Sequence, residues 1–477
     1  MKRLLLSVVA LVVLLGGLAF TVAVVPDAHA ASATPVNSAH FSNKCITPGA
    51  TDTKTGALNG ANYTIAVPSN WNGTLVLYSH GYVFTSQPLL NPAPDAPDAV
   101  TGAALLQQGY ALTGSSYSQN GWAIQQAFND QITLLHYFNQ TCGQPLRTIA
   151  WGDSLGGIIT AGLVQLHPHL FAGAMPMCGV LAGSIGTWNQ ALDSAYAFDV
   201  LLAGNSLPVV NITNPLTAYQ QAIAALNTAQ STPQGRARIS LAAALTDLPG
   251  WFDSASPEPA SNDYAAQEQN QYLWESQVDF AFAFFARAEL EARAGGNFSW
   301  NVGVNYSKQL ANSIDKTEVS NLYQQVGLNL KTDLATLNSA PRIQAKQSAV
   351  NYVSKYIVFN GNLEIPVLTL HTTGDGLVVN QQEQAYRSVV SSQDNGNLLR
   401  QLFIHRAGHC AFTPAEVVTG FGALVNRINI GNWDHTLQTA VLNQEAAALG
   451  ATFNPVPPAF IDYQPAVFLR PYDIRND

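Results

Sequence analysis

The sequence predicts an α/β fold in which helices flank a mostly parallel β-sheet. Short apolar runs typical of buried strands, such as 74–79 and 148–151, alternate with helical stretches such as 123–138. Strands that alternate with helices favour a parallel sheet with right-handed crossovers. Several of the runs end in residues that can carry chemistry, and such sheets bind ligands at the carboxyl ends of their strands.

A serine lies at the centre of Gly152-Asp153-Ser154-Leu155-Gly156, between a predicted strand and a predicted helix. A serine on such a sharp turn has a strained backbone, so the residues two before and two after it must be small. Glycine meets this need on both sides, and the hydroxyl then points out of the turn. We therefore predict that Ser154 is a nucleophile, the alternative being an ordinary glycine-rich turn.

An acidic residue and a histidine follow later strands. Strand 365–371 leads to Asp375, and strand 399–404 leads to His409, in the chain order Ser, acid, His. We predict that His409 takes the proton of Ser154 while Asp375 orients the imidazole. Rival acids and bases in the sequence are His405, Asp394, Asp434 and His435.

The first long apolar run ends in His80-Gly81-Tyr82. Glycine allows a turn tight enough for the next amide to face a substrate carbonyl. Because the first amides of a helix are also unpaired, we predict that the backbone N–H groups of Tyr82 and Leu155 form an oxyanion hole.

Aromatic side chains near these elements are candidates for a substrate pocket. Tyr117 and Trp122 come from the loop after a predicted strand at 110–117, and His80 lies beside the predicted oxyanion hole. The alternative is that His80 only braces its loop and that Tyr117 and Trp122 only pack theirs.

These motifs together resemble the α/β-hydrolase superfamily, and in particular its secreted serine esterases and lipases. The resemblance covers roughly residues 60–180 and 360–430. It implies an eight-stranded, mostly parallel sheet flanked by helices.

Two narrower families share part of this pattern. Gly408-His409-Cys410 is similar to tannase and feruloyl-esterase-like enzymes, in which a cysteine follows the catalytic histidine. In those enzymes a cysteine also precedes the serine, whereas in this chain Asp153 precedes it. The sequence therefore does not assign that family. The Gly-Asp-Ser-Leu string also matches the GDSL hydrolases, but it lies well inside this chain and no Asp-x-x-His pair occurs in the last third.

The segment between the two matching blocks predicts a cap. Residues 181–360 are mainly helical in character and follow the sixth predicted strand. We expect the core to comprise 31–180 and 361–450, with the helical cap or lid at 181–360 inserted between strands 6 and 7 and an extended tail at 451–477. A peripheral insertion away from the site is the alternative.

The N-terminus reads as an export signal. A basic start, an apolar stretch and Ala28-His29-Ala30 predict cleavage after residue 30 and a secreted protein. The apolar stretch is long, so an uncleaved membrane anchor is the alternative. A net charge of −9 without any basic run argues against nucleic-acid binding.

The four cysteines predict two disulfides after export. Cys178 ends a predicted strand at the carboxyl edge of the sheet, and Cys410 follows the predicted base at the same edge. We therefore expect the pairs Cys178–Cys410 and Cys45–Cys142, with four free buried thiols as the alternative. No metal-binding spacing occurs, and we expect no cofactor.

The sequence thus predicts a secreted serine hydrolase that cleaves a small-molecule or polymeric carboxylic ester through an acyl-enzyme. An amidase or peptidase with the same triad, and a lipase or polyester depolymerase, are the alternatives. A non-catalytic binding protein on this fold is the least favoured.

Overall fold

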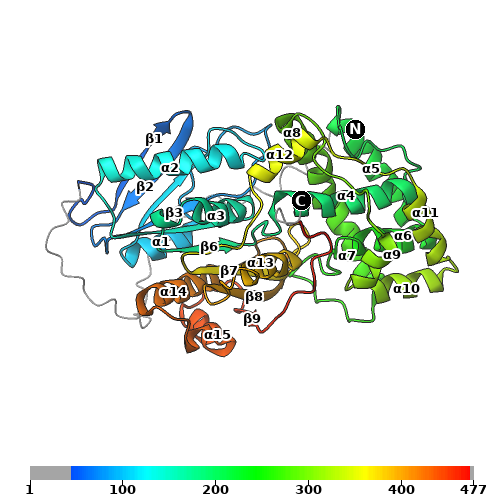
Figure 1. Cartoon of the computed structure of the whole chain (residues 1–477). Helices are drawn as coiled ribbons and strands as arrows, with labels where there is room; N and C mark the ends of the chain where they lie inside the picture. Colours follow the sequence, from blue (N-terminus) through cyan, green and yellow to red (C-terminus); the bar gives the residue numbers. More distant parts are fainter. Residues whose placement is uncertain (1–43, 473–477) are drawn as a thin grey trace, which may run out of the picture. The chain divides into compact units, whose positions relative to one another are not determined.

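The computed structural model, which describes residues 44–472, contains a nine-stranded mixed sheet with a group of helices beside it (Figure 1). The predicted signal segment at 1–30 therefore lies outside the described residues. The strands are β1 (Asp52–Leu58), β2 (Ala61–Val67), β3 (Thr74–Ser79), β4 (Ala111–Ser115), β5 (Arg147–Asp153), β6 (Gly173–Met177), β7 (Val367–Gly374), β8 (Leu399–Ala407) and β9 (Phe460–Ile461).

The strand order is β1-β2-β4-β3-β5-β6-β7-β8-β9, and the run from β4 to β8 is parallel throughout. β1, β2 and β9 pair antiparallel at the two edges. The α/β fold is confirmed. It differs from the eight-stranded expectation by β9, because two residues of the tail add to the edge of β8.

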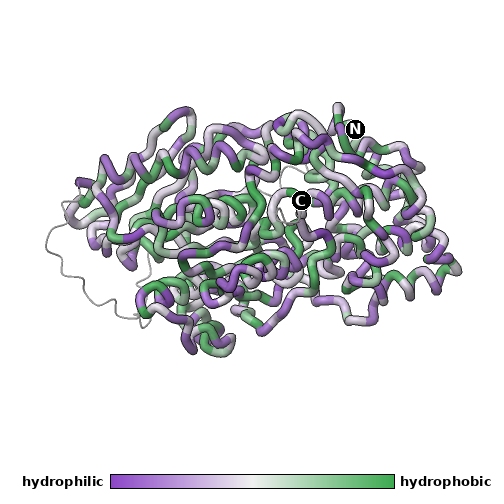
Figure 2. Tube along the Cα trace, viewed as in Figure 1, coloured by the Kyte–Doolittle hydropathy of each residue, from purple (hydrophilic) through white to green (hydrophobic). Residues whose placement is uncertain are grey.

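Helices cover both faces of the sheet. These are α1 (Ala99–Gln107), α2 (Ile124–Thr141), α3 (Leu155–Leu166), α13 (Gln381–Ser391), α14 (Pro414–Ile430) and α15 (Thr439–Ala448). Alternate residues of a strand face opposite sides of a sheet. Accordingly, Val76 and Tyr78 pack with α1, α14 and α15, whereas Leu75 and Leu77 pack with α2 and α3. β3 is buried along its whole length, and its central residues 75–77 are hydrophobic. Hydrophobic and hydrophilic residues alternate along many of the surrounding helices (Figure 2).

Two neighbouring Asn-Gly pairs near the start of the sheet differ in what they form. Asn72-Gly73 favours a hairpin between the strands on either side, but β2 pairs with β1 and β4 and not with β3. The hairpin forms instead at Asn59-Gly60, where both residues have positive φ angles of 51° and 90°. Two Asn-Gly pairs offer the same local signal, and the pairing of β2 with β4 decides between them.

The segment between β6 and β7 is helical. Its helices are α4 (Gly183–Leu202), α5 (Pro215–Gln230), α6 (Pro233–Ala244), α7 (Tyr264–Trp274), α8 (Arg287–Ala294), α9 (Tyr306–Asn312), α10 (Lys316–Gln325), α11 (Leu330–Ser339) and α12 (Gln347–Lys355). They bury a hydrophobic cluster of their own, and two π-helical turns at 275–279 and 282–286 join α7 to α8. We refer to this helical segment as the cap (Figure 1).

The tail connects the sheet to the cap. After β9 it runs without regular structure; Phe468 is buried, and Arg470 forms an ion pair with Asp193 of α4. Among residues 44–472, no helix has the length and apolar character needed to cross a bilayer.

Candidate active site

Ser154 lies on the turn between β5 and α3, in the strained backbone that the sequence predicts. Its φ is 57° and its ψ is −122°, a region that residues other than glycine rarely adopt. A Cβ atom at Gly152 or Gly156 would lie 2.4 or 1.8 Å from the carbonyl oxygen of Ser79. Glycine is therefore required at both positions for β3 and the turn to pack together.

Ser154, His409 and Asp375 form a continuous hydrogen-bonded chain. Nδ1 of His409 lies 2.7 Å from Oδ2 of Asp375, and its Nε2 lies 2.8 Å from Oγ of Ser154. Because a carboxylate only accepts, Nδ1 carries the proton and Nε2 can accept from the serine hydroxyl. The tertiary structure brings together three side chains that are up to 255 residues apart in the sequence.

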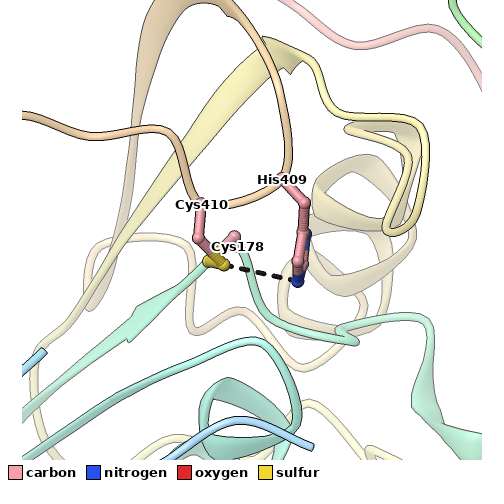
Figure 3. Close-up of side chains that lie close together, drawn as sticks. All are labelled: Cys178, His409 and Cys410. Carbon is pink, nitrogen blue, oxygen red and sulfur yellow. Dashed lines mark hydrogen bonds between the residues drawn. A yellow bond between two sulfur atoms is a disulfide. The ribbon is translucent and has the colours of Figure 1, made fainter. Parts of the chain in front are cut away.

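A disulfide lies beside His409. Cys410 is bonded to Cys178, and its sulfur lies 3.4 Å from Nε2 of His409 (Figure 3). The second disulfide joins Cys45 to Cys142, so both bonds pair the cysteines as expected. The two sulfurs and the imidazole lie close enough to hold a metal, but disulfide sulfurs are not thiolate ligands.

Asp375 is fully buried and has partners on two sides. Its Oδ1 accepts a hydrogen bond from the backbone N–H of Val378 at 2.9 Å, and its Oδ2 lies 3.5 Å from Nε2 of His371. Burial raises the pKa of Asp375, but the charges and hydrogen bonds of His409 and His371 outweigh burial and hold that pKa below its ordinary value. Asp375 is therefore kept ionised.

The sequence gives no role to His371, which the structure places behind Asp375. Its Nε2 lies 2.7 Å from the carbonyl oxygen of Val378, and its Nδ1 lies 3.1 Å from Oε1 of Glu383. Both ring nitrogens thus face acceptors, an arrangement that an imidazolium satisfies. Burial lowers the pKa of His371, but its contacts with Asp375 and Glu383 outweigh burial and raise it to about 10. The only sequence signal is a histidine four residues before the acid.

A pocket opens at Ser154, between the carboxyl edge of the sheet and the cap. Its empty volume is about 1000 Å³, including the part that is open to solvent. Tyr82, Leu155 and Trp122 line it, together with aromatic residues of the cap such as Trp188 and Phe282. Trp122 also joins core to cap, because its backbone N–H donates to Glu289 of α8 at 2.8 Å.

His80 and Tyr117 do not line this pocket. They stack on each other with ring centroids 4.1 Å apart, and the Tyr117 hydroxyl donates to the backbone oxygen of His80. Nδ1 of His80 lies 2.7 Å from the carbonyl oxygen of Gly81. Their expected place in the pocket is therefore wrong: both rings are buried beneath the loop, which they brace.

The predicted oxyanion donors lie next to the serine. A Cβ atom at Gly81 would be 3.4 Å from Cβ of Ser154, so the Gly81–Tyr82 turn packs directly against it. Within residues 44–472, neither the N–H of Tyr82 nor that of Leu155 donates to another protein group.

The rival acids and bases lie in other surroundings. His405 points to Glu258 at the surface, Asp434 accepts hydrogen bonds from Thr436, and His435 is largely exposed. Asp394 lies in an exposed turn after α13.

The strand order and the strand–serine–helix turn define a member of the α/β-hydrolase superfamily. More narrowly, this chain belongs to the tannase-like family of unknown function (DUF6351), whose model matches residues 57–443. The sequence did not assign a tannase-like family because Asp153 precedes the serine. In this structure Cys410 is bonded instead to Cys178. Cys178 directly follows β6, whose last residue, Met177, pairs with Asp153 of β5.

Comparison with characterised proteins identifies one similar sequence of stated activity. An o-phthalyl amidase of Xanthobacter agilis is 28% identical over 415 residues, which covers 79% of this chain and 87% of the amidase. Among solved structures, the rice cell wall degrading esterase LipA of Xanthomonas oryzae is 12% identical with a TM-score of 0.36, covering 78% of this chain and 85% of the esterase. An acylaminoacyl peptidase of Pyrococcus horikoshii is 9% identical with a TM-score of 0.36, and the match covers 84% of this chain but only 45% of the peptidase. At such TM-scores neither structure bears on the activity of this chain.

Proposed function

We propose that this protein is a serine hydrolase that cleaves carboxylic esters through an acyl-enzyme. The observation that carries the proposal is the chain of hydrogen bonds from Ser154 through His409 to Asp375, at the mouth of a pocket. Ser154 attacks the carbonyl carbon while His409 accepts its proton, and His409 then returns that proton to the departing alcohol. Water then attacks the acyl-enzyme in the same way, which releases the acid and restores the serine.

The remaining residues have supporting roles in this proposal. The N–H groups of Tyr82 and Leu155 stabilise the oxyanion of the tetrahedral intermediate, since both lie beside the serine without a protein acceptor. Asp375 holds the imidazole in one tautomer and stabilises the imidazolium. The chemistry requires no metal or cofactor.

An amide is the second candidate substrate, because a relative over most of the chain is an amidase. The same triad can cleave both bonds, but an amine leaves only when the histidine protonates it in time. A lipase or polyester depolymerase has no comparable support. Large apolar side chains that are exposed, such as Leu216 and Ile314, do not line the pocket.

Secretion forms part of the proposal. Two disulfides are typical of proteins that mature in an oxidising compartment, and the predicted signal segment fits export.

Labelling with a fluorophosphonate, followed by peptide mass mapping, tests the nucleophile. We expect a single label on Ser154 and none in Ser154→Ala, with circular dichroism establishing that the variant is folded. The rates of hydrolysis of a 4-nitrophenyl ester and a 4-nitroanilide of the same acyl group then distinguish an esterase from an amidase. An unlabelled, folded wild-type protein would contradict the proposal.

A further inference from the structure

Two acidic side chains lie in the wall of the pocket that holds Ser154. Glu275 and Asp279 come from the π-helical turn that continues α7, and both line the pocket. Such turns often occur at functional sites. These acids come from the cap and have no place in the catalytic chain described above.

The pocket wall around these two acids is otherwise apolar or uncharged, although two further acids, Glu268 and Asp375, lie near them outside the lining. Neighbouring wall residues include Trp188, Phe280 and Leu377, and no lysine or arginine is among the described residues that line the pocket. Glu275 is only 2% exposed, and neither of its carboxylate oxygens has a hydrogen-bond partner within residues 44–472. A buried carboxyl group without partners is costly, so this position favours a ligand that supplies one.

The acids also influence each other. Burial, the neighbouring Asp279 and Glu268 raise the pKa of Glu275 well above its ordinary value, and burial and Asp375 do the same for Asp279. Both shifts favour the protonated carboxyl group while the pocket holds no cation. A cation placed between them would favour ionisation, and proton release would accompany its binding.

We propose that Glu275 and Asp279 form a subsite for a protonated amine, so that the preferred substrates carry an ammonium group on an apolar or aromatic body. This inference rests on the proposed function only in calling the ligand a substrate. The subsite itself is a binding property. The aromatic walls would contact the body of the ligand, and the two carboxylates would pair with the ammonium group. A substrate carboxylate would meet no positive charge on this wall.

Calorimetry with benzylammonium, benzyl alcohol and benzoate tests the subsite without any turnover. We expect benzylammonium to bind at least tenfold more tightly than benzyl alcohol, and benzoate to bind most weakly. Titrations in buffers of different ionisation enthalpy should reveal proton release that accompanies benzylammonium alone.

Variants assign the effect to the two acids. Glu275→Gln combined with Asp279→Asn should abolish the preference for benzylammonium, and Asp279→Asn alone, at a half-buried position, serves if the double variant fails to fold. Glu318→Gln is the matched control, because Glu318 is a buried acid of the cap that does not line the pocket. Equal binding of the three ligands, or a preference that survives in these variants, would overturn the proposal.

A neutral 4-nitrophenyl ester separates this inference from the proposed function. If wild-type protein cleaves that ester but shows no preference for the cation, the subsite is wrong and the hydrolase stands. If the cation binds preferentially but the protein does not cleave the ester, the subsite stands and the proposed hydrolase function is wrong.

Discussion

His371 and Asp375 lie 3.5 Å apart, nitrogen to oxygen, and both side chains are fully buried. The chain of contacts that begins at Ser154 therefore extends beyond Asp375 to His371 and then to Glu383. Asp375 thus lies between two imidazole rings, those of His371 and His409.

His371→Gln tests whether His371 positions the acid. We expect turnover to fall about tenfold, which corresponds to roughly 1.4 kcal/mol of transition-state stabilisation. The acidic limb of the kcat/KM profile should move to higher pH, because a positive charge near the base is lost. A merely structural residue would lower the yield or the stability without moving the profile, and that result would contradict the role.

The same histidine predicts how stability depends on pH. Its pKa is raised to about 10 in the folded protein, against about 6.5 when unfolded. Its contribution is therefore complete below about pH 6.5 and declines as the pH rises toward 10. Urea unfolding across this range should show the decline in wild type, and a smaller one in His371→Gln.

Asp375→Asn should lower turnover by about 10⁴-fold, because the amide permits the wrong tautomer of His409. Steady-state hydrolysis of a neutral 4-nitrophenyl ester measures the loss. Asp394→Asn, in the exposed turn, is the matched control and should change nothing. A loss under about tenfold in Asp375→Asn would require a different acid.

The two disulfides should differ in their effects on catalysis. Cys178–Cys410 spans 232 residues and Cys45–Cys142 spans 97, so replacing either pair by serine should cost about 2–5 kcal/mol of unfolding free energy. Only the first bond adjoins His409, so only its loss should also lower turnover in protein that is still folded. Equal changes in turnover would contradict a role in fixing the histidine loop.

The tail is predicted to secure the cap through Arg470 and Asp193. Arg470→Met would leave Asp193 buried without its cation, which costs about 3–5 kcal/mol. Burial already raises the pKa of Asp193, and Arg470 opposes the rise. The destabilisation should therefore grow as the pH rises through the raised pKa of Asp193 in the folded protein, and vanish in acid, where the carboxyl group is neutral. Urea unfolding measures it, and the double variant Arg470→Met/Asp193→Leu should recover much of the loss.

The sequence by itself determined the local chemistry. Gly152 and Gly156 identify the strained turn around Ser154, because no other residue fits so close to a neighbouring strand. The order of Ser154, Asp375 and His409 along the chain, each after a strand, placed them at one edge of a parallel sheet. Cys178 and Cys410 lie at the same edge, so the sequence also predicted the disulfide between them. These conclusions depend only on strand direction and local backbone geometry.

The tertiary structure decided what depends on packing between distant segments. Nothing near Glu275 in the sequence indicates that its carboxyl group lines the pocket. The sequence predicts His371 only as the end of a strand, and its contact with Asp375 becomes evident only in the structure. Asn59-Gly60 and Asn72-Gly73 carry the same turn signal, and only the pairing of β2 separates them. Local sequence sets the conformation of a turn or strand, whereas contacts across hundreds of residues are set by how whole helices and strands pack.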